Sequence, residues 1–291
     1  MAKERVRSNA RVREVMTSQV ISLPVPNTRR AALKLFVKHP ISGLPIVRDD
    51  GSLIAILTRK NIFDHPNEEQ LAMIMVRAPV TIRDTDSVAD AAKTMHERGI
   101  HRLPVLNKDE KLVGIVSPID CLKVLQNLKT GEVVENFLAD FCVAVAEETP
   151  ASAALTILEA GNVKAMPVVN RRGEVSGILT DRDIYSFALQ HDEKGAAQAD
   201  LGDAEAEGKW TWEGVANIAR LYVQAEKLKM PTEPVKSFMV KEPITVYGKS
   251  SLEKAARHMV KGRFNQLPVT WPTGRLRGIV NELDILRYLW Q

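Results

Sequence analysis

A short apolar run with a proline inside it occurs four times along the chain, at residues 43–47, 102–106, 165–169 and 266–270. Other positions recur in the same register around each proline. An alanine stands thirteen residues before each proline, as Ala32, Ala91, Ala154 and Ala255. A small residue stands ten residues after each proline, as Ala55, Gly114, Gly177 and Gly278. An apolar residue stands twenty-nine residues before it, as Met16, Met75, Leu138 and Met239. This register, held without a gap, identifies four copies of an internal repeat.

Each copy predicts the element order β-α-β-β-α over about 60 residues. In copy two a β-branched stretch at 80–82 predicts a first strand. Ser87 then caps a helix whose apolar positions have helical spacing. The run at 102–106 is the second strand, with its proline at the start or on an edge. A turn and a third strand at 112–116 lead to a last helix, capped by Ser117.

The repeated motif is an apolar-Pro-Val strand followed by Gly-Ile-Val/Leu-Ser/Thr-x-x-Asp-Ile. Units of this kind resemble CBS domains, and four copies cover nearly the whole chain. The run Ile-His-Arg-Leu-Pro-Val at 100–105 resembles the γ subunit of AMP-activated protein kinase in particular. The resemblance implies an α/β (α+β) fold in which two CBS repeats pair into a Bateman module. It also implies that two modules stack into a flat disc with nucleotide clefts between repeats.

The distances between successive prolines are 59, 63 and 101 residues, so the surplus lies in the last interval. Copies one and two are therefore expected to pair, and copies three and four to pair around an insertion. The two modules, residues 10–130 and 131–291, are each expected to have their own core. The predicted boundaries are 10–68, 69–130, 131–190 and 236–291 for the four CBS repeats and 191–235 for the insertion.

The insertion predicts two parts. Residues 191–208 are rich in Ala, Gly, Asp and Glu, which predicts a loop that is dispensable for folding and for ligand binding. Residues 212–229 have helical periodicity and end before Pro231. Trp210 and Trp212 either cover the edge of the second module or form a site for a partner.

The Ser/Thr-x-x-Asp element has two interpretations. It is a helix cap, in which the hydroxyl and the carboxylate satisfy the first backbone amides. It is also suited to a nucleotide, because a helix N-terminus binds anions and a carboxylate can accept both hydroxyls of a ribose. The resemblance assigns the Asp to the ribose, and the Ser/Thr and nearby basic residues to phosphate. The implied ligand is AMP, ADP or ATP, with another adenosyl compound such as S-adenosylmethionine still open.

The four copies carry unequal sets of candidate ligand-binding residues. Copy two has the full set, namely Thr81, His101, Arg102, Ser117 and Asp120. Copy three has Lys164, Thr180, Arg182 and Asp183. Copy four keeps Thr245 and Asp284 but has Asn281 in place of the hydroxyl residue. Copy one has Ser22 and Thr58, with Asn61 in place of the Asp. Copy two is therefore expected to provide the tightest site.

Composition narrows the class of protein. Hydrophobic residues make up 45% and charged residues 26%, which is typical of globular chains. The two cysteines form no disulfide framework, and no apolar run reaches the ~18 residues of a membrane span. The expected localisation is cytoplasmic, without a membrane association.

Catalysis has little support in the sequence. The six histidines have no metal-ligand spacing, and neither H-E-x-x-H nor G-x-G-x-x-G occurs. We therefore expect a regulatory protein that is not an enzyme, requires no cofactor, and acts on a protein partner or through a homodimer. The alternative is a nucleic-acid-binding or scaffolding protein, supported by four arginines near the N-terminus. The net charge of only +4 and the acids that flank these arginines in the same tail make nucleic acid the weaker interpretation.

Overall fold

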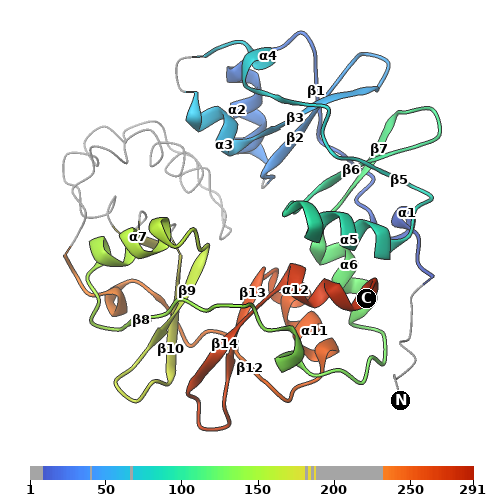
Figure 1. Ribbon diagram of the computed structural model, residues 1–291. Helices are drawn as coiled ribbons and strands as arrows, with labels where there is room; N and C mark the ends of the chain where they lie inside the picture. Colours follow the sequence, from blue (N-terminus) through green and yellow to red (C-terminus); the bar gives the residue numbers. More distant parts are fainter. Residues whose placement is uncertain (1–8, 40, 66–67, 181–182, 185–186, 188–231) are drawn as a thin grey trace.

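The computed structural model describes residues 9–39, 41–65, 68–180, 183–184, 187 and 232–291. The predicted acidic loop and the helix at 212–229 lie outside these residues, as does Arg182. The described chain forms four small sheets, one for each repeat, with helices on their faces (Figure 1). Each sheet has the β-α-β-β pattern that the sequence predicts.

The first two repeats form the N-terminal half. Copy one contains α1 (Val12–Val15), β1 (Leu23–Pro24), α2 (Arg29–Lys38), β2 (Gly43–Val47), β3 (Leu53–Thr58) and α3 (Arg59–Asp64). Copy two contains α4 (Leu71–Ile74), β4 (Val76–Arg77), β5 (Ile82–Arg83), α5 (Val88–Arg98), β6 (Leu103–Leu106), β7 (Leu112–Val116) and α6 (Pro118–Leu125). Ser87 and Ser117 cap α5 and α6, as predicted.

The last two repeats form the C-terminal half. Copy three contains η1 (Val134–Phe137), β8 (Val145–Ala146), α7 (Ala151–Ala160), β9 (Ala165–Val169) and β10 (Val175–Thr180). Copy four contains η2 (Val235–Ser237), β11 (Val240–Lys241), β12 (Val246–Tyr247), α11 (Leu252–Gly262), β13 (Gln266–Thr270), β14 (Leu276–Asn281), α12 (Glu282–Leu286) and η3 (Arg287–Leu289).

The repeated proline lies near the start of a central strand. In copy two, β6 runs between β5 and β7, and Pro104 pairs with Ile115 of β7. The parallel neighbour β5 pairs only with Val105 and Leu106, which follow the proline. The other three copies have the same register. A proline is tolerated there because the neighbouring strand does not reach the position where its missing N–H would donate.

The third strands of paired repeats meet at their hairpin turns. Ser52 of copy one bridges Lys111 of copy two, and the Leu112 N–H donates to the Gly51 carbonyl at 3.1 Å. In the other half Glu174 bridges Arg275 in the same way. Copies one and two therefore pair, and so do copies three and four, which confirms the two predicted modules.

Each repeat also sends its first residues onto the sheet of its partner. Thr17 of copy one bridges Ile115 of copy two, while β4 of copy two joins the sheet of copy one beside β3. In the second module β11 of copy four joins the sheet of copy three beside β10. The repeated Met and Gly positions meet in this exchange. A Cβ added at Gly114 would overlap Met16 Sδ and lie 2.9 Å from its Cγ.

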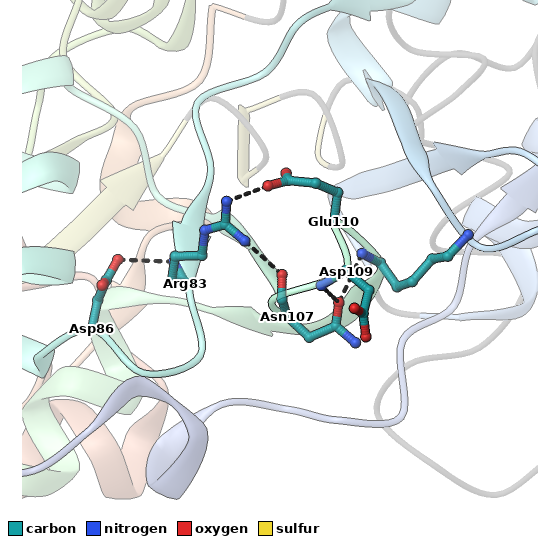
Figure 2. A network of polar contacts seen from close by, with 6 residues as sticks. Arg83, Asp86, Asn107, Asp109 and Glu110 are labelled. Carbon is teal, nitrogen blue, oxygen red and sulfur yellow. Dashed lines mark hydrogen bonds and ion pairs between the residues drawn. The ribbon is translucent and has the colours of Figure 1, made fainter.

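Polar contacts close the hairpin of copy two at the outer end of β5 and β6 (Figure 2). The Arg83 guanidinium donates to the Asn107 carbonyl at 2.7 Å and pairs with Glu110. The Asn107 side chain accepts from the N–H groups of Asp109 and Lys111, both at 3.0 Å. These bonds hold the turn that meets copy one.

The largest hydrophobic core crosses between the modules. It contains buried residues of copy two, such as Met95 and Leu122, together with buried residues of copy four, such as Met259 and Ile285. Helix α6 packs against α11 and α12, and α5 packs against α12, as Figure 1 shows beside the C-terminus. Copies one and three have smaller separate clusters. The expectation that each module has its own core is wrong, because the apolar faces of these helices cover one another across the two modules.

The Met16–Gly114 contact generates a prediction. Gly114→Ala should lower the free energy of unfolding by about 1–3 kcal/mol, because the added methyl group overlaps the Met16 side chain. Gly278→Ala is the matched control at the same register position in copy four, where the nearest atom of Leu138 would lie 3.6 Å away. Urea unfolding of both variants, and of Gly114→Ala combined with Met16→Ala, measures the contact. Equal losses in both single variants would contradict it.

The shared core generates a second prediction. Leu122→Ala should cost about 2–5 kcal/mol and reduce hydrogen-exchange protection in α11, since Leu122 is fully buried on the helix that packs there. Leu57→Ala is the control, because Leu57 is equally buried but belongs to the separate core of copy one. Exchange measured by mass spectrometry should leave α11 protected in the control. An α11 that keeps its protection in Leu122→Ala would show that the cores are independent.

Candidate functional site

The Ser/Thr-x-x-Asp elements stand where the third strand of a repeat passes into its last helix. In copy two the N–H and the hydroxyl of Ser117 donate to Asp120 Oδ2 at 3.0 and 2.7 Å. In copy three Thr180 donates to Asp183 Oδ2 in the same way, at 2.8 and 2.6 Å. Both elements therefore act as helix caps in the structure.

The two departures from the motif also make local side-chain hydrogen bonds, but only the one in copy one closes as a helix cap. Asn61 Oδ1 accepts from the N–H of Thr58 at 2.9 Å and from its hydroxyl at 2.6 Å. In copy four the Asn281 amide group donates to Asp284 Oδ2 at 2.8 Å. An asparagine can thus replace the aspartate in this cap without loss of the local hydrogen bonds. Capping alone does not require the charge of Asp120 or Asp183.

Asp120 has the most enclosed carboxylate of the motif. It is 6% exposed, and its second oxygen, Oδ1, accepts from the Lys123 ammonium at 2.7 Å. The adjacent Cys121 thiol is fully buried. Burial raises the pKa of Cys121 well above its ordinary value, and the negative charges of Asp120 and Glu282 raise it further. Cys121 is therefore a protonated core residue.

Two basic residues from different modules meet at a carboxylate of copy four. His101 Nδ1 lies 2.8 Å from Glu282 Oε1, and His101 Nε2 lies 2.7 Å from the Lys164 ammonium. An ammonium group can only donate, so Nε2 is the acceptor and Nδ1 carries the proton that is donated to Glu282. Partial desolvation lowers the pKa of Lys164, and the charge of Glu282 opposes that shift.

Arg102 extends this group of charges toward copy one. Burial lowers the pKa of its guanidinium, while the charges of Glu282 and Asp120 oppose the shift. A Cβ added at Gly43 of copy one would lie 3.8 Å from Arg102 Cδ. We name the set the junction cluster; it consists of His101, Arg102, Asp120, Lys164 and Glu282.

The junction cluster brings together four of the residues predicted from the sequence, namely His101, Arg102, Asp120 and Lys164. Lys164, assigned to copy three, contacts His101 of copy two. The other predicted positions are distributed over the four sheets. Ser22, Thr81 and Thr245 are half-buried and come directly before β1, β5 and β12. Thr58, Thr180 and Asp183 lie at the caps described above, and Asp284 accepts from Asn281 at the start of α12.

Glu282 is a member of the junction cluster that the sequence alone does not predict. This residue follows Asn281 directly, so it holds the register position of Arg59 in copy one and Pro118 in copy two. An acid at that position can be seen in the sequence. Its contact with His101, however, arises only because copy four packs against copy two.

The described residues contain no helix that is both long and apolar enough to cross a membrane. The same part of the chain has no group of three or more His, Cys, Asp or Glu side chains that could hold a metal ion.

Four β-α-β-β repeats that pair in this way define a protein of two Bateman modules. The family model of the CBS domain matches residues 12–68, 71–127, 134–189 and 235–291. The chain therefore belongs to the CBS-domain family.

Relatives of the chain include uncharacterized archaeal proteins. MJ1225 of Methanocaldococcus jannaschii is 26% identical over 197 residues, which cover 62% of this chain and 70% of MJ1225. A crystal structure from Pyrococcus horikoshii has a TM-score of 0.67 at 24% identity and covers 96% of this chain and 100% of its own. The structure of MJ1225, described as a candidate archaeal homologue of g-AMPK, has a TM-score of 0.66 at 18% identity and covers 96% and 99%. The two structures establish the shared fold.

The cap of α6 generates a prediction. Ser117→Ala removes the hydroxyl that donates to Asp120 and should lower the free energy of unfolding by about 1 kcal/mol. Ser18→Ala, at an exposed position between α1 and β1, should change it by less than about 0.5 kcal/mol. Urea unfolding compares the two variants. Equal stability of Ser117→Ala and the original chain would mean that the cap does not stabilise the fold.

Proposed function

We propose that the protein is a cytoplasmic regulatory sensor that binds AMP, ADP or ATP between its CBS repeats. The observation that carries the proposal is the junction cluster, in which His101, Lys164 and Arg102 lie around Asp120 and Glu282. Binding would change the contacts between repeats and thereby modulate a protein partner or the assembly of the chain itself.

The chemistry of the junction cluster supports a nucleotide. Basic groups that are partly withdrawn from water make strong charge-assisted hydrogen bonds to phosphate oxygens. Asp120 offers a buried carboxylate of the kind that accepts hydrogen bonds from a ribose diol. Lys123 occupies Asp120 Oδ1 and is half-exposed, so it can move into solvent when a ribose hydroxyl takes its place. The resemblance of residues 100–105 to the kinase γ subunit supports the same assignment.

Copy two is proposed as the tightest site, with Asp120 as the group that holds the ribose. The test is Asp120→Asn, because Asn61 makes the same cap contacts in copy one and the fold should therefore survive. A hydrogen bond to a charged group contributes about 1.5–3 kcal/mol, so the variant should bind AMP at least about tenfold more weakly. It should also lose discrimination between AMP and 2′-deoxy-AMP. Isothermal titration measures both effects, with Asp183→Asn as the matched variant in copy three.

Each outcome of this titration decides between interpretations. If Asp183→Asn removes the tightest phase and Asp120→Asn leaves it intact, copy three holds the main site. If neither variant changes binding, the two carboxylates serve only as caps. If S-adenosylmethionine binds to the original chain and AMP does not, the ligand is another adenosyl compound. Binding of DNA with a steep salt dependence, and of no adenosyl compound, would favour the nucleic-acid alternative.

A further inference from the structure

Glu282 is buried with one of its two carboxylate oxygens unused. The side chain is 3% exposed at the start of α12, and Oε1 contacts His101. Oε2 is buried, and within the described chain it has no hydrogen-bond partner. Leaving a buried charged oxygen unpaired is costly, so such a group points to a functional constraint.

Within the described residues, the one hydrogen bond of the Glu282 side chain links the two modules. Glu282 belongs to copy four, whereas His101 precedes β6 of copy two. His101 in turn contacts Lys164, which precedes β9 of copy three. Helix α12 itself packs against α5 and α6 of copy two. A change at Glu282 therefore acts directly on the contact between the modules.

The Glu282 carboxylate holds the position of an anion among the basic residues of the junction cluster. A phosphoryl group that approached His101 and Lys164 would meet this negative charge, and two like charges at one set of donors repel each other. We propose that Glu282 is an internal counter-anion that a phosphoryl ligand must displace. The assignment rests on the proposed function and gives Glu282 two roles. It sets the affinity for phosphate, and it couples phosphate binding to the contact between copies two and four.

The test compares a ligand that is only phosphate with one that is only nucleoside. Glu282→Gln removes the charge and keeps an amide oxygen that can accept from His101. The variant should bind inorganic pyrophosphate and AMP at least about fivefold more tightly than the original chain, with adenosine affinity changed less than twofold. Glu253→Gln is the matched control, since Glu253 is another buried acid of copy four, 7% exposed and hydrogen-bonded to Thr130. It should leave all three affinities unchanged.

Isothermal titration with pyrophosphate separates this proposal from the nucleotide proposal. Pyrophosphate affinity that is equal or weaker in Glu282→Gln, or absent in both proteins, overturns the role of Glu282. A third outcome is that pyrophosphate binds more tightly to the variant, adenosine does not bind, and the affinity for AMP is no higher than that for pyrophosphate. That outcome supports the role of Glu282 as counter-anion and contradicts the proposed adenine site. An equal gain in pyrophosphate affinity in Glu253→Gln would mean that the lower net negative charge alone causes the gain, and it would overturn the proposal.

A measurement on the original chain covers the case in which Glu282→Gln does not fold. Nitrogen-15 spectra of the imidazole should show His101 as the Nδ1–H tautomer, which is the form that donates to Glu282. Pyrophosphate at saturation should change this signal, because the Glu282 bond is lost. A His101 signal that stays the same at saturation overturns the displacement.

Discussion

The packing of copy two against copy four is the interaction on which the rest of the structure depends. Helices α5 and α6 bury their apolar faces on α11, α12 and η3, and the resulting core is the largest in the described chain. Burial of this kind is the main favourable term in folding, and here it joins residues that are far apart in sequence. The contact also brings Glu282 to His101. The polar site therefore exists only because the apolar faces meet.

Within each module the two repeats are held together differently, because each repeat adds a backbone segment to the sheet of the other. Thr17 reaches across to β7, and β4 reaches back to β3, so neither repeat of the first module completes its surroundings alone. Gly114 and Gly177 lie in the third strands of copies two and three. Because they have no side chain, Met16 and Met239 of the partner repeats can lie against the strand backbone. The exchange makes a pair of repeats the unit of folding, whereas the helix packing joins two such units.

Local features of the fold could be predicted from the sequence, and contacts between distant copies could not. The strand order, the caps at Ser87 and Ser117 and the pairing of copies follow from periodicity, turn chemistry and spacing. The recurrence of Met16 and Gly114 was visible, but only the strand exchange explains why they occur together. The shared core was missed because the apolar faces of α6 and α11 carry no information about which copy covers them. Glu282 was missed for the same reason, while His101, Arg102, Asp120 and Lys164 were named from their register and from the resemblance to CBS domains.

The four copies are related by sequence but differ at the position three residues before each repeated proline. Ser42, His101, Lys164 and Asn265 hold this position, so only copies two and three supply a basic group there. His101 and Lys164 contact each other although they belong to different modules. Copy four contributes the acid Glu282 in place of a base. The junction is thus asymmetric in charge although the fold repeats, and its basic side chains come from copies two and three. The groups proposed to hold a ligand are also among the polar groups that join the two modules, so the proposed ligand would bind where copies two, three and four meet.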